Sequence, residues 1–374
     1  MIIRRASQAR VLFVIDDMGV GGAQKQVAAA ASGLDAAGVS MGIVCLERGG
    51  VNLDRLQGAR EVHVLGAPRV FDHNGLRAAA ALARIIRSGR WDVVEAYLPA
   101  AHFISGLAGA AGRAGLVAAR RNLANLDPRW YAAAAAYLNR ATAFSITNSR
   151  TVKESIVRRY AVSPSKIAVV PNIIEPPAAG VSRAEARRRL SIPENAFVAA
   201  AVGTIGRVKN YPVLVRAFAA LLPAVPNALL VIAGDGPRRR AVTALGRSLG
   251  LDGRLRMLGM TREVDAVLAA ADVFVHASTS EGSSNALLEA MAAGLPAVVS
   301  DIPANRETLG GSGRYFAPAD WRGCLEGILE YATNPGAAAC DGARGRRRIE
   351  KRFIPAKSIS RRMRIYNTLL EASR

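Results

Sequence analysis

The feature of this sequence that most constrains its fold is the alternation of short apolar runs with longer segments of helical spacing. The apolar runs are only a few residues long and are bounded by turn residues. This alternation is typical of βαβ units, in which parallel strands form a sheet and the connecting helices cover its faces. The sequence therefore predicts an α/β protein.

Two series of such units follow one another along the chain. We predict strands at residues 11–15, 41–46, 62–65, 93–96, 115–119 and 143–147 in the first series, and at 197–202, 228–233, 255–258, 273–276 and 297–300 in the second. A proline-rich stretch at 175–177 separates them, and the C-terminal tail has apolar residues at helical spacing. We expect one domain over 1–178, a second over 179–350 and a closing helix over 351–374.

The composition excludes several classes of protein. The chain has 374 residues, of which 51% are apolar, so a large core is possible and a disordered tail or a small disulfide-stapled scaffold is excluded. The three cysteines lie far apart and no two of the four histidines have the spacing of metal ligands. Neither structural zinc nor a disulfide framework is expected.

No targeting segment is predicted. The apolar run after the basic N-terminus stops at Asp16, which is too short for a signal-peptide core, and the longest lipid-like stretch, at 100–119, consists mostly of Ala and Gly. We expect a cytoplasmic protein, and contact with the cytoplasmic face of the membrane is a further option.

Two glycine-containing loops after predicted strands could hold an anion. Gly21 and Gly22 precede a helix, whose N-terminal amides favour anions, but the loop lacks the dinucleotide pattern G-x-G-x-x-G and a tight turn explains it equally well. Gly203 begins the second loop, in which Arg207 and Lys209 could clamp a diphosphate. A solvated basic turn is the alternative.

The most informative stretch covers residues 281–289, after the strand predicted at 273–276. Glu281 would lie in a loop, and Glu289 one helical turn inside, on the same face as Asn285, where it could accept hydrogen bonds from hydroxyl groups. Two carboxylates beside a phosphate clamp point to a polyhydroxylated phosphate ester as the ligand. The alternative is that Glu281 caps the helix and Glu289 is a surface residue.

Other catalytic arrangements are missing from the sequence. It contains no G-x-S-x-G elbow, no cysteine paired with a base in an electropositive motif and no G-x-x-x-x-G-K-[ST] loop, which argues against a hydrolase triad and a P-loop ATPase. His102 lies in an apolar segment, where a satisfied core histidine is more common than a base.

The chain resembles the group 1, family 4 retaining glycosyltransferases of the GT-B fold. In the second half the resemblance rests on residues 203–210, on Gly234-Asp-Gly-Pro237, on Leu258-Gly259 and above all on the Glu-x7-Glu pattern at 281 and 289 with the Ala-Met-Ala-x-Gly-x-Pro that follows it. In the first half it rests on Gly21-Gly22-Ala-Gln24, Asn148-Ser149 and Val170-Pro171-Asn172. It covers nearly the whole chain.

The resemblance implies two Rossmann-like domains that face each other across a cleft, with the C-terminal helix returning to the first domain. The first domain would bind the acceptor and the second a nucleotide sugar, with no cofactor and no metal. The implied reaction is a retaining transfer to a glycan or lipid-linked acceptor in polysaccharide, lipopolysaccharide or glycolipid biosynthesis. The leaving phosphate would accept the acceptor's proton, which fits the lack of an obvious base.

The resemblance also assigns residues to the two sites. Arg207 and Lys209 would bind the diphosphate, Glu281 the transferred sugar and Glu289 the ribose, and Glu281, Lys209 and Arg207 are the predicted catalytic residues. The other donor-site residues are small or polar: Gly203, Asn210, Gly234, Gly259, Gly282, Ser283, Ser284 and Asn285. The predicted acceptor-site residues are Gly21, Gly22, Gln24, His102, Arg121 and Asn122.

This sequence departs from the family pattern in two places. Thr204 stands where the family often has arginine, so that role would fall to Arg207 or be lost. Residues 120–122 are Arg-Arg-Asn where many members have a histidine after the strand. Arg121 and Asn122 are expected to line the acceptor site, and an acceptor phosphate is one ligand that these two residues could bind.

The net charge of +21 implies attraction to polyanions. An anionic membrane carrying a lipid-linked acceptor fits this charge, and so does a solvated arginine-rich surface. A nucleotide-sugar epimerase or a sucrose-type synthase on the same fold is one alternative function, and a non-catalytic polyanion-binding protein is another. No nucleic acid is expected, because aromatic residues amount to only 5% and no base-stacking or groove-reading module is present.

Overall fold

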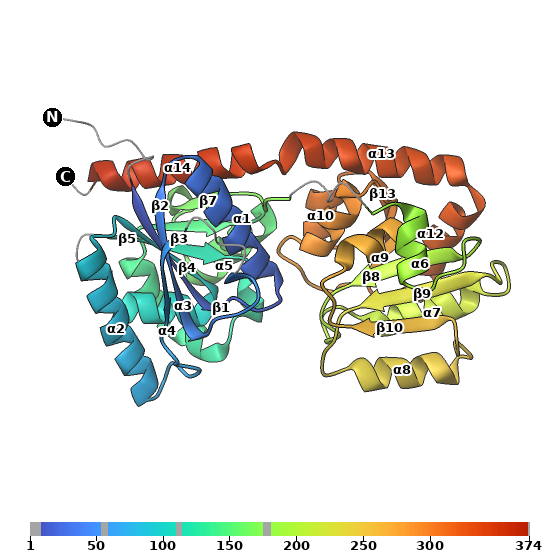
Figure 1. Ribbon diagram of the computed structural model, residues 1–374, viewed down its shortest axis with the longest axis horizontal. Coiled ribbons are helices and arrows are strands. Elements are labelled where there is room, and N and C mark those ends of the chain that lie inside the picture. Colours follow the sequence, from blue (N-terminus) through green and yellow to red (C-terminus); the bar gives the residue numbers. More distant parts are fainter. Residues whose placement is uncertain (1–8, 54–58, 110–113, 175–180, 373–374) are drawn as a thin grey trace. The chain divides into compact units, whose positions relative to one another are not determined.

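The chain divides into two compact units (Figure 1). The computed structural model describes residues 9–53, 59–109, 114–174 and 181–372, apart from the side chain of Arg60. Unit 1 comprises Met1–Glu175 and Phe353–Arg374, and unit 2 comprises Pro176–Arg352. The domain boundary predicted near residue 178 and the proline-rich stretch at 175–177 lie outside the described residues.

Unit 1 is built on a seven-stranded parallel sheet with the strand order β3-β2-β1-β4-β5-β6-β7. The strands are β1 (Arg10–Asp17), β2 (Ser40–Arg48), β3 (Ala59–Val64), β4 (Val93–Tyr97), β5 (Gly115–Arg120), β6 (Phe144–Thr147) and β7 (Ile167–Val169). The helices between them are α1 (Gly22–Ala36), α2 (His73–Gly89), α3 (Leu98–Leu107), α4 (Arg129–Ala141) and α5 (Arg150–Tyr160), with short 3-10 turns at η3 (Ala124–Leu126) and η4 (Pro164–Lys166).

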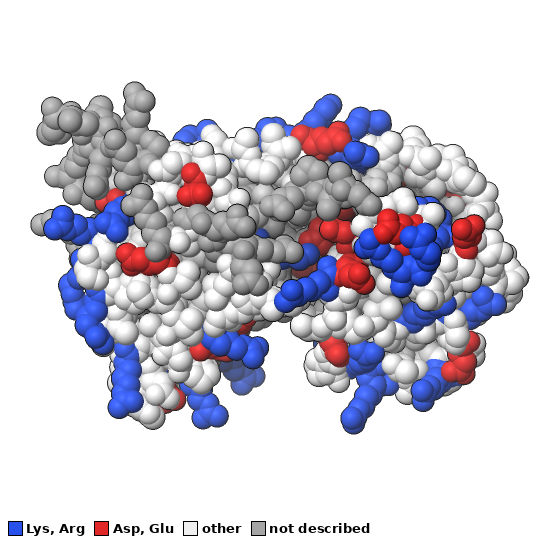
Figure 2. All heavy atoms as spheres, in the orientation of Figure 1, with Lys and Arg blue, Asp and Glu red and all other residues white. Residues whose placement is uncertain are grey.

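Helix α2 has one buried face and one basic face. Asp72 caps its N-terminus by accepting hydrogen bonds from the amides of Asn74 and Gly75. The outer face exposes Arg77, Arg84 and Arg87, and Figure 2 shows basic side chains along this edge of unit 1.

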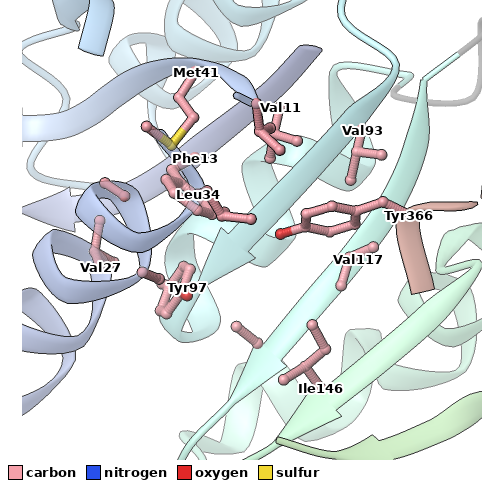
Figure 3. Packing of buried hydrophobic residues seen from close by; sticks show 14 of the residues in the cluster. Val11, Phe13, Val27, Leu34, Met41, Val93, Tyr97, Val117, Ile146 and Tyr366 are labelled. Atoms are coloured by element: carbon pink, nitrogen blue, oxygen red, sulfur yellow. The ribbon is translucent and has the colours of Figure 1, made fainter. Parts of the chain in front are cut away.

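The sheet of unit 1 is buried on both faces, which explains why its strands read as continuous apolar runs. Side chains alternate along a strand, so Phe13 and its neighbours two residues away lie on one face, whereas Leu12 and Val14 lie on the other. Figure 3 shows the first face, where Phe13 packs near Leu34 of α1 and Tyr366 from the C-terminal helix joins the same cluster.

Unit 2 is built on a six-stranded parallel sheet with the order β10-β9-β8-β11-β12-β13. Its strands are β8 (Phe197–Val202), β9 (Ala228–Ala233), β10 (Leu255–Gly259), β11 (Val273–His276), β12 (Ala297–Ser300) and β13 (Gly313–Phe316). Its helices are α6 (Arg183–Arg189), α7 (Tyr211–Leu221), α8 (Arg239–Ser248), α9 (Val264–Ala270), α10 (Asn285–Ala292), α11 (Pro303–Leu309), α12 (Trp321–Thr333) and α13 (Pro335–Arg352). The prediction of two Rossmann-like parallel-sheet domains is confirmed.

Three features near the C-terminus differ from the sequence prediction. Strand β13 was not expected, because it is short and only Phe316 in it is fully buried. Helix α13 contains glycines, which lower helix propensity, but Gly342 packs so closely on another backbone that a Cβ there would lie 2.1 Å from the Gly294 carbonyl oxygen. The closing helix expected from residue 351 begins at Pro355, because proline cannot continue the helix before it.

The closing helix, α14 (Pro355–Ala372), returns to unit 1 as predicted and is held there by a buried polar network. Arg362 and Glu95 of β4 are both almost fully buried, with 3.4 Å between Arg362 Nε and Glu95 Oε1. Tyr366 donates to Glu95 Oε2 at 2.5 Å, and Arg362 Nη2 donates to the Tyr97 hydroxyl at 3.0 Å. Burial alone would lower the pKa of Arg362, but Tyr97 and Glu95 raise it above its ordinary value.

Removing the carboxylate of this network should destabilise unit 1. We expect Glu95→Ala to lower the free energy of unfolding by about 3–5 kcal/mol, because it leaves the Arg362 guanidinium buried without an anionic partner. Urea denaturation followed by tryptophan fluorescence measures this, since Trp91 and Trp130 lie in unit 1. Arg364→Met, on the exposed face of the same helix, is the control and should change the value by less than about 0.5 kcal/mol. Equal stability of Glu95→Ala and wild type would contradict the prediction.

Candidate active site

The candidate donor site lies at the switch point of the unit 2 sheet, which is the place between β8 and β11 where the order in which strands are added reverses. Strand β8 pairs with β9 on one side and with β11 on the other, so the connections from β8 and β11 leave toward opposite edges. In parallel sheets the loops separate at such a point, outside the carboxyl ends of the strands, and leave room for a ligand. The loop after β8 carries Lys209, and the loop after β11 carries Glu281.

These two loops are joined by an ion pair. Lys209 Nζ donates to Glu281 Oε1 at 2.6 Å. His276, the last residue of β11, has its Nε2 at 3.3 Å from the same oxygen, but its ring is not aligned for a hydrogen bond. All three side chains are largely buried. The charges of a buried acid and a buried base therefore compensate each other across the switch point.

The surroundings keep Glu281 ionised. Burial alone would raise the pKa of Glu281, but Lys209 and His276 outweigh it, and the pKa lies well below the ordinary value of 4.5. Burial lowers the pKa of His276, so that its imidazole is neutral at neutral pH. A permanently ionised carboxylate only accepts hydrogen bonds, which is the property needed to hold sugar hydroxyl groups.

Glycines bring the neighbouring loops together. Gly203 and Gly234 have φ angles of +145° and +151°, a region that L-residues with side chains rarely adopt. A Cβ on Gly234 would lie 2.0 Å from the Gly203 carbonyl oxygen, so no side chain fits there. The Gly234 amide donates to the Gly259 carbonyl at 2.8 Å. The three predicted glycines thus line up the loops that follow β8, β9 and β10.

Arg207 and Asn210, two further predicted site residues of the loop after β8, make different contacts. The Arg207 side chain is exposed, and no ion pair or hydrogen bond to it is found among the described residues. Asn210 adopts the left-handed conformation at the start of α7, with φ of +51°, and its Nδ2 donates to the Pro318 carbonyl at 2.7 Å. Arg207 is therefore accessible to a ligand, whereas Asn210 fixes the shape of the loop.

The start of α10 is capped by Ser284, whose hydroxyl accepts a hydrogen bond from the Leu287 amide. The alternative in which Glu281 caps this helix is therefore wrong. Gly282, between Glu281 and Ser284 in the sequence, is buried, and Ser283 and Asn285 on either side of the cap are half-buried. Glu289 is also half-buried, one turn inside α10. All the predicted donor-site residues lie in unit 2, at the carboxyl ends of its strands or in the first turns of α10.

In unit 1, Gly21 and Gly22 lie at the corresponding switch point. Strand β1 lies between β2 and β4, and the loop after β1 leads through Gly21, the N-cap residue, into α1. The Gln24 side chain folds back over this turn, because a Cβ on Gly21 would lie 2.2 Å from Gln24 Oε1. The three predicted residues therefore lie together at the carboxyl edge of the sheet.

His102 is a satisfied core histidine. Its Nδ1 lies 2.7 Å from the Tyr131 hydroxyl and its Nε2 lies 2.7 Å from the Thr142 hydroxyl oxygen. Burial and, to a lesser extent, Arg120 hold the pKa of His102 well below its ordinary value, so the ring is neutral. Both ring nitrogens are engaged within unit 1, so His102 shapes the wall of a pocket and has no free nitrogen for an acceptor.

Arg121 and Asn122 follow β5, and two motifs noted in the sequence converge on Arg121. Its Nη2 donates to Asn172 Oδ1 at 2.5 Å, and Asn148 Nδ2 donates to its carbonyl at 3.3 Å. Burial lowers the pKa of Arg121 to about 10, so it is charged at neutral pH. Asn122 is exposed. Both residues line a pocket together with His102.

Two polar residues at these sites were not assigned to them from the sequence. His276 looked like part of an apolar strand, and only the fold brings it beside Glu281. Arg120 ends β5 and lines the same pocket as Arg121, and the signal that could have revealed it was a cation at the carboxyl end of an otherwise apolar strand.

Over the described ranges, no group of three or more His, Cys, Asp or Glu side chains is arranged to hold a metal ion. Among the helices of those ranges, none combines the length and apolar character needed to cross a bilayer.

Comparison with known proteins gives matches over most of the chain. Residues 182–348 match the family model described as glycosyl transferases group 1, and residues 20–176 match the model of glycosyltransferase family 4. One relative is the Escherichia coli UDP-Gal:alpha-D-GlcNAc-diphosphoundecaprenol alpha-1,3-galactosyltransferase, 32% identical over 41% of this chain. Another is the D-inositol 3-phosphate glycosyltransferase of Salinispora arenicola, 34% identical over 42% of this chain. The matches span 41% and 39% of these relatives' own lengths.

A solved structure with a similar fold is that of Anabaena HepE in complex with UDP and glucose. The TM-score is 0.83 at 19% sequence identity, and the superposition covers 95% of this chain and 98% of that chain. This similarity shows that the two units together have the GT-B fold.

The buried carboxylate at the switch point predicts a pH-dependent stability of unit 2. The folded-state pKa of Glu281 is depressed, so its ion pair stabilises the fold at pH values above 4.5 and loses this effect as the pH falls below 4.5. We expect Glu281→Gln to be less stable than wild type by an amount that is constant above pH 4.5 and shrinks below it. Urea denaturation at a series of pH values, followed by the fluorescence of Trp321, measures this difference.

The matched control is Glu326→Gln, which changes an exposed acid within α12 of the same unit. Its stability should follow that of wild type at every pH. A difference between wild type and Glu281→Gln that grows on acidification would contradict the prediction.

Proposed function

The chain belongs to the group 1, family 4 glycosyltransferases, and on this basis we propose that it transfers a sugar from a nucleotide sugar to a hydroxyl group of a glycan or lipid-linked acceptor. The observation that carries the proposal is the Lys209–Glu281 pair, which places a cation for a diphosphate and a carboxylate for sugar hydroxyls within 2.6 Å of each other at the switch point. In this proposal the anomeric configuration is retained.

Lys209 and Arg207 hold the leaving diphosphate. The Lys209 ammonium has three donors, of which Glu281 uses one, so others remain for phosphate oxygens. Arg207 adds a planar guanidinium that pairs with two phosphate oxygens at once. The amides at the start of α10, from Gly282 to Asn285, add the positive end of the helix dipole. Neutralising this leaving group is the main requirement for breaking the bond at the anomeric carbon.

The bond changes require no protein base. The oxygen of the acceptor hydroxyl bonds to the anomeric carbon as the bond from that carbon to the diphosphate oxygen breaks. The acceptor's proton moves to the departing phosphate oxygen on the same face of the sugar, which preserves the configuration. Glu281 holds hydroxyl groups of the transferred sugar, and Glu289 holds those of the ribose. The reaction proceeds without a metal ion, so chelators leave its rate unchanged.

Named relatives support the choice of substrates. The Escherichia coli relative is named for transfer of galactose from UDP-galactose to GlcNAc-diphosphoundecaprenol, and HepE has been solved with UDP-glucose. A nucleotide sugar donor and a lipid-linked acceptor are therefore the substrates that we propose for this chain, which would act in polysaccharide, lipopolysaccharide or glycolipid assembly.

Unit 1 also has a surface suited to a lipid bilayer, which we define as the aromatic patch: Phe71, Phe103 and Trp130. The Phe71 ring lies 5.1 Å from Phe103 and 5.0 Å from Trp130, between ring centroids, although Phe71 is 62% exposed. Leu76, 68% exposed, and the basic face of α2 lie next to it along the chain. Aromatic rings flanked by arginines are typical of proteins that dock at the surface of anionic membranes. We propose peripheral docking at the cytoplasmic face through this patch.

The donor site predicts which variants lose activity. We expect one sugar nucleotide from a panel of UDP-, GDP-, ADP- and dTDP-sugars to raise the melting temperature of the wild type and to be hydrolysed slowly in the absence of acceptor. Lys209→Ala should lower hydrolysis about 10²- to 10³-fold, because the developing charge on the diphosphate loses its fixed cation. Product release from the panel, measured by chromatography, gives the rates.

Arg247→Ala, which removes an exposed arginine at the end of α8, is the control and should match wild type. If no sugar nucleotide binds, or if Lys209→Ala hydrolyses the donor as fast as wild type does, the proposed function is wrong. Formation of a glycoside with a lipid-linked acceptor, as opposed to an epimerised donor or a sucrose-type product, separates a transferase from the other enzymes of this fold.

The aromatic patch predicts a loss of membrane binding on substitution. We expect Phe71→Ser to weaken cosedimentation with phosphatidylcholine vesicles that contain phosphatidylglycerol, because a buried aromatic ring contributes apolar area at the bilayer interface. Tyr137→Ser, which changes another exposed aromatic residue of unit 1 outside the patch, is the control. Equal sedimentation of Phe71→Ser and wild type would exclude docking through this patch.

A further inference from the structure

The pocket after β4 and β5 in unit 1 contains a buried cation, and the described residues use only part of its hydrogen-bonding capacity. Arg120 is 8% exposed and its Nη2 donates to Asn139 Oδ1 at 2.5 Å. Its Nε and Nη1 are also buried, and they have no hydrogen-bond partner among the residues that the structure describes. Buried donors without an acceptor destabilise a fold, so such an arrangement usually serves a ligand or a mechanism.

The rings around Arg120 hold the guanidinium in place. Its Cζ lies 5.5 Å from the centre of the Tyr131 ring and 5.4 Å from that of Tyr160. These contacts and the bond to Asn139 fix the orientation of the side chain, so an incoming anion meets a cation that needs no reordering.

The pocket also contains a carboxylate, which interacts with Arg120 through its charge but forms no ion pair with it in the described part of the chain. This carboxylate is that of Asp127, whose Oδ2 accepts a hydrogen bond from the Tyr160 hydroxyl at 2.8 Å. Arg121 adds a second guanidinium to the lining. The pocket therefore keeps an excess of positive charge beside apolar walls from Ala96, Leu98 and Pro99, where a low local dielectric strengthens the attraction for an anion.

We propose that this pocket binds a phosphate or diphosphate group, held by Arg120, and that this group belongs to the acceptor. The assignment to the acceptor rests on the proposed function, because the pocket lies in unit 1 and the donor residues lie in unit 2. Guanidinium groups pair with phosphate through several charge-assisted hydrogen bonds, and two of them favour a group with more than one negative charge over a single carboxylate. The same chemistry occurs on a soluble phosphate ester and on a phosphorylated lipid.

The test is the binding of inorganic pyrophosphate to the full chain in a Lys209→Ala background, which removes the cation of the donor site. We expect Arg120→Gln to weaken this binding about 10- to 100-fold, because a charge-assisted contact is lost. Asp127→Asn, which removes the carboxylate from the pocket, should tighten it. Arg140→Gln, an exposed arginine next to Asn139, is the control for net charge and should leave binding unchanged. Isothermal calorimetry measures each constant, and circular dichroism verifies the fold of each variant.

The opposite responses of the two variants keep the proposal falsifiable even if Arg120→Gln folds poorly. If the role of Arg120 is only structural, Asp127→Asn will bind pyrophosphate no more tightly than its parent. Unchanged binding in Asp127→Asn would therefore overturn the proposal. Equal binding of pyrophosphate by Arg120→Gln and its parent, or equal binding of acetate and pyrophosphate, would overturn it as well.

A second arm identifies the source of the phosphate. Phosphatidylcholine vesicles containing phosphatidic acid replace free pyrophosphate. A loss of binding in Arg120→Gln that is confined to pyrophosphate indicates a soluble phosphate ester, and a loss in both arms indicates a phosphorylated lipid. Failure of the proposed function is distinguishable from failure of this inference. Donor hydrolysis by the wild type tests the former, whereas pyrophosphate binding in the Lys209→Ala background tests the latter.

Discussion

One constraint of parallel sheets organises this molecule: every strand of a sheet ends at the same edge. The loops that follow β8 and β11 are separated by about 70 residues in the sequence, yet they meet because the two strands are neighbours in the sheet. The same geometry in unit 1 brings the glycine turn after β1 and the arginines after β5 to one edge of the seven-stranded sheet. The helices between the strands bury the faces of the sheet and leave this edge for polar side chains.

The buried charged groups have different roles, which depend on whether their hydrogen bonds are all formed within the protein. The Glu95–Arg362 pair fastens α14 to β4 and is enclosed by the tyrosines of both elements, so its role is structural. The Lys209–Glu281 pair lies at a switch point with donors left over, so a ligand can share its cation. Arg120 has aromatic rings around it, and its Nε and Nη1 have no acceptor among the described residues, so a ligand can provide one. In each case the low dielectric around the side chain makes a buried charge without a partner costly in free energy. A buried charge with a partner is tolerated only in the geometry that pairs it.

Several elements could be predicted from the sequence because their local signals agree with the fold. The strands at 197–202 and 228–233 correspond to β8 and β9, since each is a continuous apolar run bounded by turn residues. Helix α10 ends before Gly294, whose φ of +78° explains the glycine there. The family resemblance is confirmed, because it rests on glycines and carboxylates at fixed spacings. In contrast, β13 and α13 carry weak local signals and form because β12 and the backbone at Gly294 offer them a surface.

By itself, the sequence determined the two parallel-sheet units, the identity of the family and the loops in which the donor residues lie, because these depend on short-range patterns. Only the tertiary structure decided which charges meet. It showed that His102 is engaged at both nitrogens and that Glu281 pairs with Lys209 and does not cap α10. It also showed that Arg120 retains donors that no described residue uses. The physical reason is that the hydrogen-bond partners of a buried group, and the water that it loses, depend on residues far apart in the chain. The spacing of residues along the sequence therefore does not predict how many of its hydrogen bonds are formed in the folded protein.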